Sequence, residues 1–228
     1  NWPELPLGTF GVNSGPMMAA VDEFDITVKG KGGHAASPHL AIDPVVISAQ
    51  VISAVQTIIS RSTDPVDKAL ISITKINAGT AYNVIDDEVK MGGTIRTFRR
   101  ETRAYIEKRL NELCKGIADA HGAEIKIEFD LVNKYPPTIN SKEETKFAAN
   151  VAKDLVGDDK VITDIDPSMG GEDFSYLLEK KPGSYLYLGQ GDAEHSAHLH
   201  TTKYDFNDNL LPIGVNFWVD LVQKYFSK

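Results

Sequence analysis

Apolar and polar residues alternate in several short stretches of the first 130 residues. Phe24, Ile26 and Val28 are separated by Asp25 and Thr27. A period of two predicts a strand with one buried and one exposed face. The same period recurs in residues 71–74, 88–98 and 125–130. The pattern therefore predicts four strands in this part of the chain.

Two segments between these strands have the spacing of an amphipathic helix. The first begins with Asp43 and Pro44, a pair typical of a helix N-terminus, and continues with an apolar stripe at Ile47, Val51, Val55 and Ile58. The second spans residues 100–121, has its stripe at Ile106, Leu110, Leu113 and Ile117, and ends at His121-Gly122. The order β-α-β-β-α-β predicts a ferredoxin-like unit.

The pattern changes after YPPTIN, residues 135–140. Helices are expected around 147–155, at the start of GGEDFSYL and in the closing segment, and strands near Val161 and in SYLYLG. Alternating helices and strands predict an α/β layer, but two strands are too few for a separate sheet. The opening residues, NWPELPLGTFG, read as an apolar loop from the middle of a longer protein. We therefore expect part of a larger domain here.

Charge and cysteine content narrow the class of protein. The chain has 24 basic and 32 acidic residues, and the basic ones are scattered, so neither nucleic acid nor a membrane surface is an expected partner. No apolar run approaches the roughly 18 residues that span a bilayer. The single cysteine, Cys114, cannot form an internal disulfide, which favours a reducing, cytoplasmic location.

The histidines gather in two clusters. His34 and His39 lie in KGKGGHAASPH, and the other cluster is GDAEHSAHLH, in which His198 and His200 are two residues apart. In an extended segment both would project to one face beside several acidic residues, which is ligand chemistry for zinc or manganese. For any one of these histidines taken singly, a solvated surface position is the favoured alternative. The glycine-rich stretch matches neither a P-loop nor a dinucleotide fingerprint, so a phosphate site is excluded.

Three further residues are candidates. Glu172, in SMGGEDFSY, is equally well explained as a helix cap and as a residue that orients a metal ligand. Arg96 lies in a strand, where its guanidinium suits a substrate carboxylate, although an internal ion pair with Asp86 or Glu88 is the simpler interpretation. Asn83 lies in the loop that precedes this strand.

Together these stretches resemble the dinuclear-metal amidohydrolases, the metallopeptidase family that includes aminoacylase, hippurate hydrolase, plant auxin-conjugate hydrolases and diaminopimelate deacylases. The matching motifs, in family order over nearly the whole chain, are VKGKGGHAASPH, DPV, AYNVI, GTIRTF, MGGEDFS and LHTTKYDFND. Their combination is highly specific, and the bacterial hippurate hydrolase-like branch is the most similar. One departure is Asp86, where the family usually has proline.

The resemblance implies an α+β fold. A ferredoxin-like lid and dimerisation domain, residues 23–134, would be inserted into an α/β zinc-peptidase-like catalytic domain, of which only the later half, residues 1–22 and 135–228, is present. The upstream metal ligands and the glutamate pair that contains the general base would lie outside these residues. We therefore expect the 228-residue chain alone to be inactive.

The resemblance also implies roles for single residues. His200 would be a metal ligand, and His34 the lid histidine that polarises the scissile carbonyl, often from the partner subunit. Asn83 and Arg96 would lie at the carboxylate end of the substrate, and Glu172 near the metal.

The implied activity is hydrolysis of the amide bond of an N-acyl amino acid by a metal-activated water. Two divalent ions, zinc, manganese or cobalt, would be incompletely liganded by this chain, and the protein would be a homodimer through the lid. Two alternatives remain open: a dipeptidase or aminoacyl exopeptidase of the same family, acting on short peptides, and a non-catalytic dimerisation module.

Overall fold

The computed structural model describes residues 1–132 and 134–227 and divides into two compact units. Unit 1 comprises residues 1–18, 138–168 and 172–228, and unit 2 comprises residues 19–137 and 169–171. The boundaries expected from the sequence fell between residues 22 and 23 and between 134 and 135. The first strand of unit 2 begins earlier than the alternation indicates, at Ala20 instead of Phe24.

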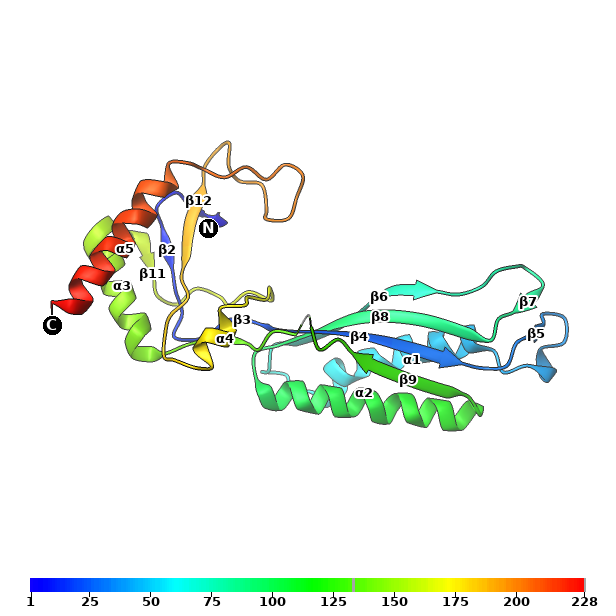
Figure 1. Cartoon of the computed structure of the whole chain (residues 1–228). Coiled ribbons are helices and arrows are strands. Elements are labelled where there is room, and N and C mark those ends of the chain that lie inside the picture. Colours follow the sequence, from blue (N-terminus) through cyan, green and yellow to red (C-terminus); the bar gives the residue numbers. More distant parts are fainter. Residues whose placement is uncertain (133, 228) are drawn as a thin grey trace. The chain divides into compact units, whose positions relative to one another are not determined.

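Unit 2 is built on a four-stranded antiparallel sheet (Figure 1). Its strands are β4 (Ala20–Lys29), β6 (Ala69–Asn77), β8 (Glu88–Thr97) and β9 (Glu124–Phe129), in the spatial order β6-β8-β4-β9. Helix α1 (Pro44–Thr57) connects β4 to β6, and helix α2 (Arg100–His121) connects β8 to β9. The predicted β-α-β-β-α-β order is confirmed.

The core of unit 2 lies between the sheet and the two helices. Phe24, Ile26 and Val28 of β4 are buried there, as the alternation predicts. They pack with apolar residues of the other elements: Ile47, Val51 and Val55 of α1, Val89, Met91 and Ile95 of β8, and Ile106, Leu110 and Cys114 of α2. The intervening residues, such as Asp25 and Lys29, are exposed, so the second face of the sheet is polar.

Both helices of unit 2 have the ends that the sequence predicts. The Asp43 carboxylate accepts hydrogen bonds from the amides of Val45 and Val46 at the start of α1. Gly122 ends α2 in the left-handed conformation, with φ 63°, where a side chain would add strain.

One helical segment, Pro44–Ser62, is long and apolar enough by length and composition to cross a membrane, contrary to the expectation from the sequence. It consists of α1 and a π-helical turn, η2 (Ile58–Ser62). Its apolar stripe, including Ile47, Val51 and Val55, lies in the core of unit 2, whereas Val45 and Val46 are exposed. Core helices meet the same criterion, so this is weak evidence for a membrane span.

A second four-stranded sheet forms the centre of unit 1, in the order β1-β12-β2-β11. Its strands are β1 (Trp2–Pro6), β2 (Phe10–Gly11), β11 (Val161–Ile162) and β12 (Tyr187–Gly191). The expectation of a loop over residues 1–11 is therefore wrong. The prolines of β1 are the reason that the sequence does not predict this strand. Among the described residues β1 lies at an edge of the sheet, where a missing N–H is tolerated.

Helices α3 (Lys142–Val156) and α5 (Leu210–Phe226) pack on the sheet of unit 1 through Phe10, Val12, Val151 and Phe217. A two-stranded ribbon, β3 (Gly15–Met18) and β10 (Thr138–Asn140), completes this unit. The helix expected to open at GGEDFSYL is short: α4 spans only Ser175–Leu178. Two 3₁₀ turns, η1 (Pro38–Leu40) in unit 2 and η3 (Asp158–Lys160) in unit 1, complete the helical elements described.

Candidate functional site

The candidate residues divide between the two units. His34, Asn83 and Arg96 belong to unit 2, and Glu172 and His200 belong to unit 1. Each group is therefore described within its own unit.

The glycines before His34 allow close approaches of the main chain. A Cβ atom on Gly30 would lie 2.0 Å from the carbonyl oxygen of Ile42, and one on Gly32 would lie 2.7 Å from that of Ile85. No side chain fits at such distances. The Gly32 amide also donates to the Asp87 carboxylate at 2.8 Å. The glycine-rich stretch therefore shapes the turn that presents His34.

His34 and Asn83 are neighbours in a small two-stranded ribbon, here called the β5–β7 ribbon. Strand β5 (Gly33–His34) pairs with β7 (Val84–Ile85), with His34 opposite Val84 (Figure 1). The amide of Ala35 donates to the carbonyl oxygen of Asn83 at 3.1 Å. The structure thus brings together two candidate residues that are far apart in the sequence, and both are exposed.

The imidazole of His34 has a defined orientation. The amide of Ala36 donates to His34 Nδ1 at 3.0 Å, so Nδ1 acts as an acceptor. In a neutral imidazole the proton then resides on Nε2. The exposed His34 could therefore donate a hydrogen bond from Nε2–H to a carbonyl oxygen.

Arg96 lies at the opposite end of the sheet from the β5–β7 ribbon. This ribbon extends the β4–β8 pair beyond Glu88, whereas Arg96 lies near the far end of β8. From position 88 to 96, a strand rise of about 3.4 Å per residue gives a separation of roughly 27 Å. Within one chain, Arg96 is therefore far from His34 and Asn83.

The surroundings of Arg96 are polar. Its Nε donates to the hydroxyl of Thr94 at 3.1 Å, beside a cavity of about 290 Å³ that is also lined by Glu23, Asp25 and Lys75. Burial lowers the pKa of the guanidinium, and the carboxylates of Glu23 and Asp22 oppose that shift. A carboxylate ligand would offset this burial.

The simpler interpretation of Arg96, an ion pair with Asp86 or Glu88, does not hold in the described part of the chain. Asp86 accepts a hydrogen bond from the hydroxyl of Thr80 at 3.0 Å, and Glu88 pairs with Lys90 at 3.1 Å.

Glu172 has two kinds of contact. Its Oε1 accepts from the amide of Phe174 at 3.2 Å, in the turn that precedes α4. The N-cap residue of α4 is Phe174 and no side chain caps this helix, so Glu172 is not the helix cap that the sequence offered. Its Oε2 accepts from the hydroxyl of Tyr185 at 2.7 Å. Burial first, and this hydrogen bond second, raise the pKa of Tyr185, which keeps the hydroxyl a donor. Sequence reasoning did not identify Tyr185.

His200 lies in a turn. Its φ of 61° makes it the only non-glycine residue with a positive φ in the described ranges. The premise of an extended segment is therefore wrong, and His198 and His200 do not share a face by alternation. His198 Nδ1 instead contacts Glu4 Oε1 at 2.7 Å. A histidine in the left-handed region is uncommon and indicates a conformation imposed by its surroundings.

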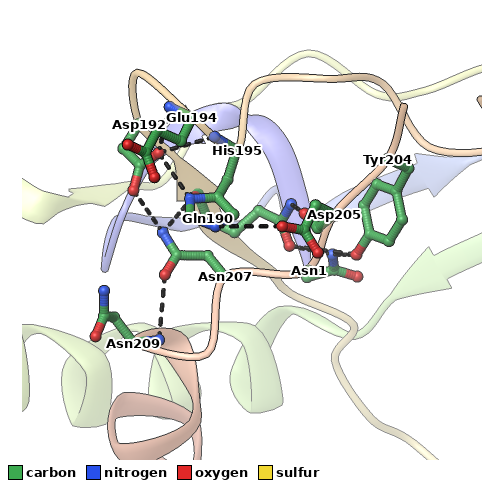
Figure 2. A network of polar contacts seen from close by, with 9 residues as sticks. All are labelled: Asn1, Gln190, Asp192, Glu194, His195, Tyr204, Asp205, Asn207 and Asn209. Carbon is green, nitrogen blue, oxygen red and sulfur yellow. Dashed lines mark hydrogen bonds and ion pairs between the residues drawn. The ribbon is translucent and has the colours of Figure 1, made fainter.

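A polar network lies at the base of the loop that carries His200 (Figure 2). His195, the third histidine of the cluster, makes its ring contact with Asp192: Nδ1 lies 2.8 Å from Oδ1. The backbone amide of Glu194, then the His195 ring, and then the backbone amide of His195 lower the pKa of Asp192 to about 2. The contact with Asp192 raises the pKa of His195. His195 is thus engaged within the loop.

A complete metal site is absent from the described residues. No group of three or more histidine, cysteine, aspartate or glutamate side chains in residues 1–132 and 134–227 could hold an ion. A protein site for a catalytic zinc needs about three such ligands. These residues therefore do not fit a metal centre by themselves, and His200 could supply at most one ligand.

Known proteins similar to this chain are hydrolases. Residues 3–224 match the model of peptidase family M20/M25/M40. The hippurate hydrolase of Campylobacter jejuni is 37% identical over 99% of this chain and 58% of that protein. The N-acetylcysteine deacetylase of Bacillus subtilis is 36% identical over 97% of this chain and 56% of that protein.

A solved structure agrees in fold. The Bacillus subtilis YXEP protein, described as a dinuclear metal binding peptidase, superposes with a TM-score of 0.77 at 31% identity, over 97% of this chain and 54% of that one. The chain thus spans a little over half the length of these relatives.

Proposed function

Because the chain belongs to peptidase family M20/M25/M40, we propose that the whole protein is a metal-dependent amidohydrolase that cleaves the amide bond of an N-acyl amino acid. The names of two relatives, a hippurate hydrolase and an N-acetylcysteine deacetylase, both describe substrates of this class. The observation that carries the proposal is the exposed His34, whose Nδ1 accepts from the Ala36 amide, held beside Asn83 in the β5–β7 ribbon.

Each residue of unit 2 has a distinct role in this proposal. His34 Nε2–H donates to the carbonyl oxygen of the scissile amide as negative charge develops there. The Asn83 side chain, next to it, offers a second polar contact to the substrate. Arg96 binds the carboxylate of the amino acid, which its planar guanidinium can hold through two hydrogen bonds.

The same proposal requires two chains for one site. His34 and Asn83 lie at one end of the sheet and Arg96 lies roughly 27 Å away along β8, so a small substrate cannot contact both groups within one subunit. We infer a homodimer through unit 2, in which the β5–β7 ribbon of one subunit serves the other. Strand β6 lies at an edge of its sheet and offers a surface for such pairing.

The metal ions belong to the whole protein. We propose two divalent ions, a number that the description of the relative as dinuclear supports. They would be zinc, manganese or cobalt. His200 would be the ligand that this chain contributes, and Glu172 would orient a ligand. The remaining ligands and the general base would lie in the part of the relatives that this chain does not span. By the same reasoning the 228-residue chain alone is inactive.

The test is an assay of the full-length protein against N-acyl amino acids and dipeptides, with zinc, manganese or cobalt added. We expect acyl amino acids to be cleaved with the higher kcat/KM. Faster cleavage of dipeptides would favour the alternative, a dipeptidase, which the description of the YXEP protein as a peptidase supports. No cleavage of either class would contradict the proposal and favour a non-catalytic dimerisation module.

A further inference from the structure

The loop of residues 192–207, here called the His200 loop, begins directly after β12 and ends shortly before α5. It carries His200 near its middle. Its two ends are joined by side chains at its base, and Figure 2 shows these contacts.

Asp192 forms the first half of this base. Its Oδ1 accepts from the backbone amides of Glu194 and His195, each at 2.8 Å, and contacts the ring Nδ1 of His195 at the same distance. Its Oδ2 accepts from the side-chain amide of Asn207 at 2.8 Å. One carboxylate therefore fixes the first residues of the loop and ties them to its last residue.

Asn207 forms the second half. It is 1% exposed, and its Nδ2 also donates to the backbone carbonyl of Gln190 at 3.1 Å. Its Oδ1 accepts from the amide of Asn209, just before α5 begins. Asn207 thus joins the end of β12, the loop and the first turn of α5.

Gln190 adds a second connection across the base. This residue is fully buried, and its Nε2 donates to the backbone carbonyl of Asp205 at 3.0 Å. Two separate side-chain contacts therefore hold the ends of the loop together. Asn207 and Gln190 are buried, and buried polar side chains whose hydrogen-bond partners are satisfied restrict a segment to one conformation.

The conformation that is held includes the positive φ of His200. Non-glycine residues remain in this region only when the surrounding structure determines the backbone strongly. Exposed loops are otherwise free to relax such a residue. The base contacts hold the two ends of this loop, and local contacts of His198, with Glu4 and with the Thr201 hydroxyl, lie closer to His200. Together these contacts can impose this conformation on the loop.

We propose that Asp192 and Asn207 are positioning residues, whose mutual contact fixes the His200 loop and thereby the place of the His200 ring. This inference rests on the proposed function, in which His200 serves the reactive site. In this proposal neither Asp192 nor Asn207 contacts the substrate.

Asn207→Asp tests the contact directly in the full-length protein. The new carboxylate keeps an acceptor for the Asn209 amide, and with it the start of α5, but it loses the donor to Asp192 and places a like charge opposite it. We expect backbone amides of residues 193–203 to exchange with solvent at least about tenfold faster, because the loop opens locally. We also expect kcat/KM and the affinity for divalent metal to fall about 10- to 100-fold.

The double variant Asp192→Asn/Asn207→Asp restores a donor and an acceptor in reversed order. It should recover part of the amide protection and of kcat/KM, which a merely destabilised protein would not do. Asn150→Asp makes the same change at an exposed position on α3 and is the matched control. It should leave loop exchange, metal retention and rate unchanged.

Three results would overturn the inference. They are unchanged exchange in residues 193–203 of Asn207→Asp, acceleration spread evenly over unit 1, and no recovery in the double variant. If Asn207→Asp fails to fold, Asp192→Asn at the exposed partner carries the same test. His200→Ala distinguishes a failure of the proposed function from a failure of this inference. If this variant leaves metal content and rate unchanged, the proposed function fails. The exchange measurement on Asn207→Asp still decides whether the base contacts fix the loop.

Discussion

Tyr185 donates its hydroxyl hydrogen to Oε2 of Glu172 at 2.7 Å, across a turn and a short helix. The ring of Tyr185 packs edge-on against Tyr187, which stacks on Trp2. Glu172 is therefore held by an aromatic residue whose own position is fixed by unit 1, and the other oxygen of Glu172 is fixed by the Phe174 amide.

Tyr185→Phe should lower the free energy of unfolding by about 1–2 kcal/mol, because a half-buried carboxylate loses a charge-assisted hydrogen bond. Chemical denaturation measures the change. Tyr225→Phe, on an exposed tyrosine of α5, should have little effect. An equal loss in both variants would mean that the hydroxyl of Tyr185 contributes nothing specific.

His34→Ala in the full-length protein should lower kcat on the order of a hundredfold while metal content and thermal stability stay unchanged, as expected for the loss of one donor to a developing oxyanion. His39→Ala, in the same surface stretch, is the matched control and should keep the rate. A rate for His34→Ala within about threefold of wild type would remove His34 from the reaction.

Mixed dimers test whether His34 acts across subunits. His34→Ala and His200→Ala chains, each of low activity alone, should regain activity when mixed, since one of the two sites then has an intact His34 and an intact His200. Mixtures that stay inactive, while native mass spectrometry shows heterodimers, would place both residues in the site of the same chain.

The free energy of unfolding of His200→Gly should be about 1 kcal/mol higher than that of His200→Ala, because glycine adopts a positive φ without steric strain. At His198, which lacks a positive φ, the order of the glycine and alanine variants should reverse. Denaturant titration of the four variants measures both differences. An alanine at position 200 that is as stable as glycine would contradict the strained turn.

The Asp192–His195 contact should give stability a defined pH window. The pKa of Asp192 is lowered to about 2, so its contribution is present above the unfolded pKa near 3.8 and is lost as pH falls through 2. The pKa of His195 is raised above 6.5, so its contribution is present below 6.5 and is lost as pH rises through the folded value.

The difference in stability between wild type and His195→Gln should therefore be largest between about pH 4 and pH 6.5 and smaller on both sides. Thermal unfolding across this range measures it. A difference that does not change with pH would show that the contact carries no charge-dependent stabilisation.

Gly30→Ala should displace the turn before His34, since the added Cβ would meet the Ile42 carbonyl oxygen at 2.0 Å. We expect a loss of stability and of activity together. Gly116→Ala, in the middle of α2 with open space around it, should instead stabilise the protein by about 0.5–1 kcal/mol. Thermal unfolding and the amide hydrolysis assay check both variants.

Local patterns were sufficient for most of unit 2 and, in unit 1, for α3, α5, β11 and β12, but they did not predict β1 and β2. The alternation around Ile26 and the helix cap at Asp43 depend only on residues close together in the chain, so the order of elements could be predicted. Strand β1 was not predicted, because Pro3 and Pro6 are typical of loops and because its partner, β12, is distant in the chain.

The candidate site divides in the same way. His34 stood out by its glycine-rich surroundings, but its pairing with the segment after Asn83 depends on a long-range ladder that no local pattern records. Tyr185 and the Asp192–Asn207 contact were missed for the same reason. The sequence shows acidic residues around His200, but which amides donate hydrogen bonds to them depends on how the loop folds.

The β5–β7 ribbon is held by main-chain hydrogen bonds, and the side chains of His34 and Asn83 are both exposed. Folding therefore places little constraint on which amino acids occupy these two positions. A combinatorial library that randomises them would retain a folded scaffold in most of its members, so differences in rate between members would report on the two side chains and not on loss of the fold. Protein engineers would find at this ribbon a pair of positions where chemistry and stability can be varied independently.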